Sequence, residues 1–484
     1  MLDAALPIVV LICLIAVTIV LFGLDATNGP LQVALLLSAA FASLIAFKNG
    51  YTTAAIAEAA VGGVTSAMGA IFILLAVGAL IGTWNMAGTI PTIVHYGLSF
   101  LSPTWFYFAS AAICALVGVV TGSSWTTAGT LGVAFVGMAE VLGLSDSIAA
   151  GAVISGAYFG DKMTPLSETT ILVPQLIGRG LTVGRHIRNM IWTAGPALGI
   201  GLAIFLVLGL RAHPSGAAST EAAQRALEAE FHISVVSLLP LLFLVVCSVR
   251  KFPPFLSILG SALFAGILAC FTQWVIVEAF VNDPSLGPVA TGFKAIYGAM
   301  ATGFVSNTGN EAIDSLFSRG GMASMLTTIW LVLGALSFAA IMEHAGFLTR
   351  LLRPIVSRTK SRGRLIFAAN ASGIGLNVIA GDQYVAVVLP ARMFRDEFDQ
   401  RGLVPQVLSR AVEDSGTVTS VLVPWNTCGA YISGVLGVST ASYLPFCFFN
   451  LLSPVLDVIF GFIGFKVPSK APAPAVIDPT IEHE

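Results

Sequence analysis

The sequence predicts an all-α polytopic membrane protein with about 10–12 transmembrane helices, in two inverted-topology repeats with broken or re-entrant helices at the midplane. Three observations support this fold class. Hydrophobic residues make up 56% of the chain and charged residues only 10%, with a mean hydropathy of +0.90, whereas a soluble domain carries roughly 25% charged residues. Apolar runs long enough to cross a bilayer recur along the chain, and its two halves resemble each other weakly.

The apolar runs predict spans of about 20 residues each. The clearest runs are 5–24, 31–47, 68–84, 187–210, 231–249 and 255–277. One sizeable polar stretch, rich in Pro, Gly and Ser at its start, separates the two halves. We predict the following order: an N-terminal transmembrane hairpin (1–50), a first repeat (51–210), an external polar linker (211–230), connecting transmembrane helices (231–305), a second repeat (306–465) and a polar C-terminal tail (466–484).

Basic residues near helix ends mark the cytoplasmic side of a membrane protein. Three clusters place their loops inside: Arg179, Arg185 and Arg188; Arg250 and Lys251; and Arg350, Arg353, Arg358, Lys360, Arg362 and Arg364. The span 68–84 then starts inside, whereas the span 325–345 ends inside. The two copies should therefore cross the membrane in opposite directions, as the inverted repeats of secondary transporters do.

Three pairs of segments carry the internal similarity, in the same order and at offsets of 250 to 259 residues. The pairs are 62–80 with 320–336, "GSSW" (122–125) with "GDQY" (381–384), and "SETTILVP" (167–174) with "TVTSVLVP" (417–424). The last pair aligns the segment that contains Asp161 with the segment that contains Asp414.

Four segments at membrane depth are too polar, or too rich in Gly and Pro, for ordinary membrane helices. Such backbone is tolerated only where it lines a cavity or packs in protein. We interpret 121–130 and 380–384 as tips of re-entrant helices, and 156–174 and 411–427 as broken helices. Unwound carbonyls and hydroxyls at such places suit a small hard cation, which takes oxygen ligands. A fifth polar stretch, 306–314, either caps an interfacial helix or lines an entrance.

Three aspartates in these segments, Asp161, Asp382 and Asp414, are the candidates for sodium binding. A charge at the membrane centre costs at least ~2.5–3.5 kcal/mol on insertion scales, so such residues mark a transport pathway by default. A partly buried carboxylate can also exchange a proton for a cation. Neutral oxygen ligands come from the same segments: Thr164, Ser167, Thr169, Thr170, Ser415, Thr417, Thr419, Asn426 and Thr427.

Two interpretations of Lys162 stay open: it neutralises Asp161 or Glu168 as a structural ion pair, or it contacts the carboxylate of an organic substrate. Glu413 lies beside Asp414 on a predicted helix, so at most one of them faces the site, and we favour Asp414. The cysteines lack CxxC spacing and the histidines lack helical pairs, so we expect no metal cluster and no cofactor. No basic stripe indicates nucleic acid as a partner.

Longer motifs run through most of the chain, from about residue 50 to 465. They are "GALIGTWNMAGTIPTIVHYGL" (78–98), "GSSWTTAGTLGVA" (122–134), "GAYFGDKMTPLSETT" (156–170), "GFVSNTGNEAIDSLFSRGGM" (303–322), "GDQYVAVVLPARMF" (381–394) and "EDSGTVTSVLVPWNTCGAY" (413–431). Together they resemble the NhaC-type sodium/proton antiporter family of the ion-transporter superfamily. The resemblance implies sodium or proton coupling, an inverted-repeat fold with paired re-entrant hairpins, and a homodimer in the lipid membrane.

Matched residue by residue, the family pattern assigns ion-binding positions in both halves. The first hairpin tip holds Ser123, Ser124 and Thr126, and the second holds Asp382. The broken helices hold Asp161, Thr164, Ser167 and Glu168 in the first half and Asp414, Ser415, Thr417, Asn426 and Thr427 in the second. The first tip departs from a Thr-Ser-Trp-Gly-Thr type, and Glu168 stands where Asp is commoner. Both departures keep oxygen ligands but change the size of the site.

The sequence therefore predicts a secondary active antiporter that exchanges sodium for protons by alternating access. We expect a multi-pass protein of the bacterial cytoplasmic (inner) membrane that is not an enzyme. The alternative is a sodium- or proton-coupled exchanger of organic anions such as malate and lactate, or of amino acids, on the same fold. An intramembrane aspartyl protease is disfavoured, because residues 379–382 are Ile-Ala-Gly-Asp rather than Gly-x-Gly-Asp.

Overall fold

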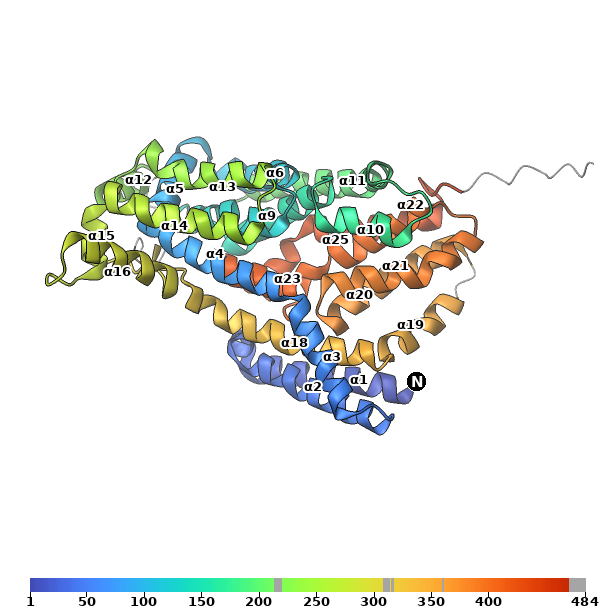
Figure 1. The fold of residues 1–484 in the computed structure, drawn as a ribbon. Helices are drawn as coiled ribbons and strands as arrows, with labels where there is room; N and C mark the ends of the chain where they lie inside the picture. Colours follow the sequence, from blue (N-terminus) through green and yellow to red (C-terminus); the bar gives the residue numbers. More distant parts are fainter. Residues whose placement is uncertain (213–219, 308–313, 315–316, 359–360, 470–484) are drawn as a thin grey trace, which may run out of the picture.

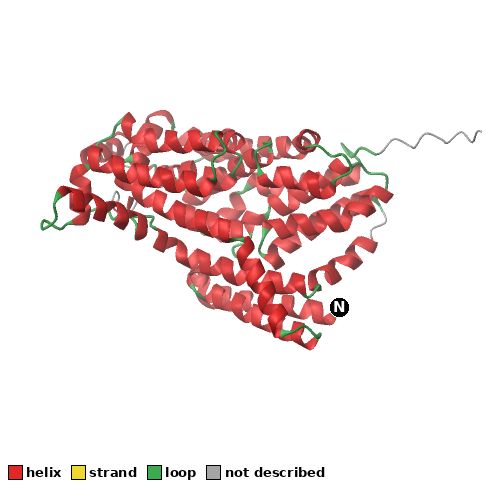
Figure 2. Ribbon diagram, in the orientation of Figure 1, coloured by secondary structure: helices red, strands yellow, loops and turns green. Residues whose placement is uncertain are grey.

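The computed structural model is an assembly of helices (Figure 1, Figure 2). It describes residues 1–212, 220–307, 314, 317–358 and 361–469. Within this part of the chain every regular element is helical, and one isolated bridge joins Leu403 and Ser469. Among the described residues, eight helices are long and apolar enough to cross a membrane, or ten if each of two bent pairs is one span. The structure therefore has the all-α polytopic class that the sequence predicts.

The helices fall into an N-terminal hairpin, two halves and a connecting group. The hairpin is α1 (Leu2–Phe22) and α2 (Pro30–Lys48). The first half comprises α3 (Thr53–Ser66), α4 (Met68–Met86), α5 (Thr89–Phe100), α6 (Pro103–Thr121), α7 (Ser124–Thr127), α8 (Val133–Val141), α9 (Asp146–Lys162), α10 (Glu168–Ile177) and α11 (Val183–Leu210). The connecting group comprises α12 (Thr220–Glu230), α13 (Leu239–Val249), α14 (Pro254–Thr272), α15 (Trp274–Val281) and α16 (Pro288–Ala301). The second half comprises α18 (Leu326–His344), α19 (Phe347–Arg358), α20 (Arg362–Ala380), α21 (Gln383–Gln400), α22 (Pro405–Val412), α23 (Thr427–Leu436), α24 (Thr440–Tyr443) and α25 (Phe448–Ile463).

The two halves repeat each other in helix length as well as in order. The pairs α4/α18, α5/α19, α6/α20 and α10/α23 have 19, 12, 19 and 10 residues in both members. Each second-half helix begins 258 or 259 residues after its counterpart, as 68 to 326 and 168 to 427 illustrate. In Figure 1, α4 runs from right to left and α18 from left to right. These two counterparts therefore run in opposite directions.

Two predicted spans differ from the observed helices. The run 231–249 contains a 3-10 turn before α13, and the chain bends by 91° between the end of α12 and the helices that follow. The run 255–277 is interrupted at Gln273, which separates α14 from α15. The buried Gln273 side chain accepts a hydrogen bond from His232 N (3.0 Å) and donates one to His232 O (2.9 Å), so this polar residue joins a neighbouring loop instead of continuing an apolar helix.

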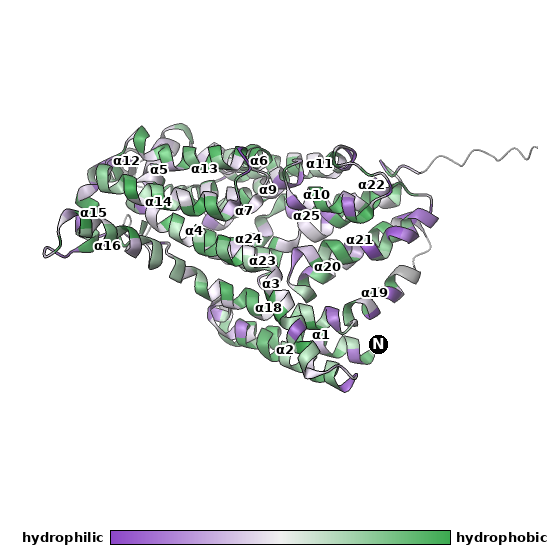
Figure 3. Ribbon diagram, in the orientation of Figure 1, coloured by the Kyte–Doolittle hydropathy of each residue, from purple (hydrophilic) through white to green (hydrophobic). Residues whose placement is uncertain are grey.

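Apolar packing joins the N-terminal hairpin to the second half. Helix α18 packs against α2 and α3, and Gln32 donates to the Thr327 carbonyl (3.2 Å). Figure 3 shows α4 and α18 as predominantly hydrophobic, with hydrophilic segments on α19 and α21 toward the right of the view. Helix α12 occupies part of the predicted linker. Residues 308–313 of the predicted polar stretch and 470–484 of the predicted tail lie outside the described residues.

Candidate ion-binding site

Two re-entrant hairpins end in tips of the same backbone geometry. In the first, α6 ends at Gly122 (φ 71°) and Ser123 caps α7. In the second, α20 ends at Gly381 (φ 61°) and Asp382 caps α21. Each capping side chain accepts a hydrogen bond from the backbone N–H three residues on, at 3.1 and 3.0 Å. Glycine is required at both turns because other residues pay a steric penalty at positive φ.

Each tip packs against the break in the broken helix of its own half. A Cβ atom on Gly122 would approach Leu166 Cβ to 2.6 Å, and one on Gly381 would approach Trp425 O to 3.1 Å. Leu166 and Trp425 hold equivalent places, each directly before the residue that caps the next helix. The tip and the break therefore form one compact unit in each half.

The two broken helices correspond at an offset of 259 residues, not at the 250 that the sequence comparison gave for them. Ser167 caps α10 and Asn426 caps α23, with φ and ψ of −70° and 138° against −71° and 144°. Pro165 and Pro424 precede these caps by two residues and lack the N–H that would continue a helix. The two "LVP" strings of the sequence alignment are not equivalent: the first lies inside α10 and the second ends in the break.

Asp161 lies in the last turn of α9 and reaches the first tip. Its Oδ2 accepts hydrogen bonds from the backbone N (3.1 Å) and Oγ (2.6 Å) of Ser124, at a helix N-terminus that favours a negative charge. The equivalent positions in the second half are Gln383 and Ser420, and Ser420 Oγ donates to Gln383 Oε1 at 3.5 Å. The second half therefore has a hydrogen bond between the two equivalent positions, but neither residue is an acid. The acid of the second half is Asp382, which caps α21.

Each tip also contacts the broken helix of the other half. Tyr384, on α21, donates its hydroxyl to Glu168 at the start of α10. Trp125, on α7, stacks on Tyr431 of α23 with ring centroids 4.1 Å apart, and the Tyr431 hydroxyl donates to the Trp125 carbonyl (2.9 Å). Trp125 and Tyr384 are equivalent in the repeat, and each contacts the broken helix of the other half. The contacts are therefore reciprocal between helices, although their partners Glu168 and Tyr431 are not counterparts.

The neutral ligands predicted in the first half surround its tip and break. Thr126 Oγ1 donates to Ser123 Oγ (3.1 Å). Thr164 Oγ1 accepts a backbone hydrogen bond from two residues on (3.3 Å), and Ser167 and Thr169 share a hydrogen bond (3.2 Å). A hydroxyl retains acceptor capacity while it donates. Rotation of these hydroxyl groups can therefore direct their oxygens toward a cation while the backbone of the tip and the break stays in place.

The neutral ligands predicted in the second half are more firmly engaged. Asn426 caps α23 and donates to Asn377 Oδ1 (3.0 Å), while the backbone N–H of Thr427 donates to the tip glycine carbonyl (2.9 Å). Ser415 Oγ donates to a carbonyl one turn earlier in its own helix (2.7 Å). Among the described atoms, the buried Thr417 Oγ1 has no hydrogen-bond partner. It lies in a π-helical turn, a feature that often occurs at functional sites.

Asp414 lies in a buried ion pair with Lys162, and neither side chain is exposed. The Asp414 carboxylate also accepts hydrogen bonds from the hydroxyls of Ser453 and Thr193, the latter at 2.8 Å. From the sequence we expect Asp414 to face Asp161, and two roles stay open for Lys162: an ion pair with Asp161 or Glu168, or a contact with an organic carboxylate. The partner of Lys162 in the structure is Asp414. The arrangement differs because consecutive helical residues point about 100° apart, so Lys162 points away from the first tip while Asp161 points toward it.

Two further buried clusters of titratable side chains were not predicted from the sequence. Arg410 Nε donates to Asp457 Oδ1 (2.6 Å), and Asn370 donates to the other oxygen of this carboxylate (2.8 Å). His186 Nε2 lies 3.9 Å from Glu413 Oε1, with both side chains fully buried. Asp457 could have been found, because it is the one acid in the apolar run 448–463. The other partners are far apart in sequence, which gives no signal of their contact.

Comparison with known proteins places these features in a family. A model of the Na+/H+ antiporter family matches residues 3–177 and 156–465. The Na(+)/H(+) antiporter NhaC of Alkalihalophilus pseudofirmus is 39% identical over 438 residues, which are 90% of each chain. The arginine/ornithine antiporter ArcD of Halobacterium salinarum is 35% identical over 97% of this chain and 93% of that protein. The malate-2H(+)/Na(+)-lactate antiporter of Bacillus subtilis is 33% identical over 90% of each chain. The chain thus belongs to the Na+/H+ antiporter family.

Proposed function

We propose that the protein is a secondary active antiporter that exchanges sodium for protons by alternating access. The observation that carries this proposal is the pair of tips. Asp161 and Asp382 stand at the tips of two oppositely running halves, and both are half-buried, whereas Asp414 is fully buried in an ion pair. Membership of the Na+/H+ antiporter family supports the same two cations.

The chemistry of exchange follows from the cost of an unpaired carboxylate inside a membrane. Such a charge costs at least ~2.5–3.5 kcal/mol near the bilayer centre, so each tip aspartate favours an occupied state. A sodium ion satisfies the carboxylate with help from hydroxyl and carbonyl oxygens, and a proton satisfies it by forming an O–H bond. Because one carboxylate accepts either cation but not both, the movement of the two ions is coupled in opposite directions.

A coupled exchanger of organic anions or amino acids is the alternative, and the names of two relatives are of this kind. In this alternative, the ammonium group of Lys162 would bind the carboxylate of the substrate. In the structure its ammonium is buried against Asp414 and Ser453, so it is already neutralised. This pairing favours inorganic cations over an organic acid as the transported solute.

Reconstitution separates the two functions. Purified protein in proteoliposomes with an imposed pH gradient and an internal pH-sensitive dye should dissipate the gradient when sodium chloride is added. Potassium chloride is the control for ionic strength, and lithium is a second test cation. Malate, lactate, arginine and ornithine are added in separate arms. Dissipation that requires one of the organic solutes would refute sodium/proton antiport and support the alternative.

The chain is a multi-pass membrane protein, and we place it in the bacterial cytoplasmic membrane because its relatives named as antiporters include bacterial ones. We infer a transporter without enzymatic activity and without a bound cofactor, with sodium and protons as its ions. The family resemblance supports a homodimer in the lipid bilayer, which cross-linking in native membranes tests.

A further inference from the structure

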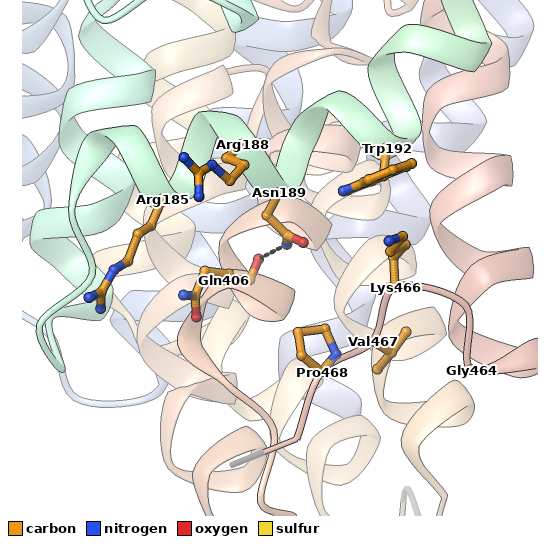
Figure 4. A pocket seen from close by; sticks show the side chains of 9 residues that line it. All are labelled: Arg185, Arg188, Asn189, Trp192, Gln406, Gly464, Lys466, Val467 and Pro468. Atoms are coloured by element: carbon orange, nitrogen blue, oxygen red, sulfur yellow. Dashed lines mark hydrogen bonds between the residues drawn. The ribbon is translucent and has the colours of Figure 1, made fainter. Parts of the chain in front are cut away.

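A cavity of about 560 Å³ lies where the starts of α11 and α22 meet the segment after α25 (Figure 4). Its walls are formed by Arg185, Arg188, Asn189, Trp192, Gln406 and the segment 464–468. Asn189 donates to the Gln406 carbonyl (2.7 Å), which holds the two helix starts together on one side of the cavity. None of the residues that line the cavity belongs to either tip or to either helix break.

The charges around this cavity are all positive. Arg185, Arg188 and Lys466 line it, and no acidic residue does. In the described part of the chain, Arg185 and Arg188 make no ion pair, and Lys466 Nζ lies 4.0 Å from the centre of the Trp192 ring. Figure 4 shows both arginines and Trp192 on α11, with Lys466 beside the indole. Three unneutralised cations around one hollow favour an anion as its occupant.

The position of the cavity in the membrane narrows the choice of anion. Arg185 and Arg188 lie in the first two turns of α11, the longest membrane helix, on the side that the basic clusters mark as cytoplasmic. That depth is the headgroup region of the inner leaflet. Arginine presents donors in a planar fork that matches the oxygens of a phosphate.

An apolar surface continues from the cavity along the two helices that border it. Ile191 and Trp192 on α11 and Ile459 and Phe462 on α25 are 40%, 40%, 46% and 59% exposed. Helices α11 and α25 pack against each other, and these four exposed side chains lie near the ends of the two helices that border the cavity. A ligand with an anionic head and apolar tails matches this combination better than a free inorganic anion does.

We propose that the cavity binds the phosphate headgroup of an anionic phospholipid of the cytoplasmic leaflet, with its acyl chains along α11 and α25. Basic pockets between membrane helices on this side are suited to anionic headgroups. The Lys466 carbonyl accepts from Arg410 Nη1 (3.0 Å), and Arg410 also binds Asp457 of α25. The bound lipid should therefore stabilise the packing of α11, α22 and α25. This proposal is independent of the transported ion.

The test is thermal stability of the purified full chain in detergent, with defined lipid added. Phosphatidylglycerol or cardiolipin should raise the Tm, phosphatidylcholine should not, and salt should weaken the effect. The variant Arg185→Gln/Arg188→Gln should lose most of the lipid-dependent Tm shift. Arg250→Gln, an exposed cation of another basic cluster, is the matched control and should keep the shift. If the double variant is unstable, Lys466→Gln and native mass spectrometry of wild-type lipid complexes replace it.

Three outcomes would overturn the proposal. An equal Tm shift with inorganic phosphate would make a free anion the occupant. A chain ending at residue 469 that binds phosphatidylglycerol much more tightly than the full chain would make the acidic C-terminal residues the resident occupant. An undiminished lipid effect in both Arg185→Gln/Arg188→Gln and Lys466→Gln would place the lipid elsewhere. Loss of the shift in these variants alone supports the site.

Discussion

Asp161 and Asp382 can be tested without disturbing the fold, because asparagine keeps the hydrogen bonds that hold each of them. Asparagine caps helices about as well as aspartate, and at position 161 it can still accept from Ser124. We expect Asp161→Asn and Asp382→Asn to insert normally and to lose sodium-dependent dissipation of a pH gradient, because an amide cannot exchange a proton for a cation. Asp146→Asn, at the opposite end of α9, is the control. Wild-type exchange in both tip variants would refute the assignment.

The Lys162–Asp414 pair predicts a different behaviour, since neither side chain is exposed. Breaking a buried pair by removing one partner typically costs about 3–5 kcal/mol, whereas replacing both partners with apolar residues can be nearly neutral. We expect Lys162→Met to lower the Tm in detergent sharply, and Lys162→Met/Asp414→Leu to recover much of the loss. Differential scanning fluorimetry measures both. A double variant that is as unstable as the single variant would contradict a purely pairwise role for Lys162.

Acids next to helix breaks can be identified from the sequence more readily than their contact partners. Asp161 and Asp382 could be singled out because charge is rare in so apolar a chain and each follows a glycine where a helix breaks. The partner of Lys162 could not be found in this way, because ion pairing depends on which face of α9 meets α25 and the π-helical turn. The contact between His186 and Glu413 joins residues 227 positions apart and also requires the tertiary structure.

The helix breaks were predicted from their prolines and glycines, and their equivalence in the two halves required the structure. Helix lengths repeat closely, yet the second broken helix has few residues identical to those of the first. Backbone angles identify Ser167 and Asn426 as counterparts although one carries a hydroxyl and the other an amide. The repeat thus keeps the turns and caps, which are requirements of the backbone, while the side chains proposed to bind ions differ between the halves.

The glycine at each tip should tolerate no side chain. Gly122 and Gly381 have positive φ, and a Cβ would also enter the break that each one faces. Gly402 has the same kind of backbone (φ 66°) with no atom within 4 Å of a Cβ, so it is a matched control. We expect Gly402→Ala to cost about 1–2 kcal/mol, and Gly122→Ala to cost more and to impair exchange.

Melting in detergent and dye-based transport assays provide the two measurements. The comparison separates backbone strain from loss of the contact between tip and break. The effect should be larger at Gly122, where the nearest atom would be 2.6 Å away, than at Gly381, where it would be 3.1 Å away. If Gly122→Ala behaves like Gly402→Ala, the close approach at the tip has no energetic importance.

The two halves are linked because each supplies a tip to its own break and an aromatic residue to the broken helix of the other half. Tyr384 contacts Glu168, and Trp125 stacks on Tyr431. A movement of one half relative to the other must therefore change both cross-contacts together. This reciprocity is the structural basis on which alternating access can operate in an inverted repeat.

The orientation of the whole molecule gives a final prediction. The turn between α2 and α3 and the loop between α15 and α16 lie at opposite ends in Figure 1. Asn49 and Ser285 are exposed at these two places. Because the basic clusters should remain in the cytoplasm, Asn49→Cys should react with a membrane-impermeant maleimide only in inverted vesicles, and Ser285→Cys only in intact cells or right-side-out vesicles. The exposed Cys13 is replaced by serine in both variants to remove background labelling. Labelling of both positions from the same side would contradict the membrane orientation, and with it the opposite directions assigned to the two halves.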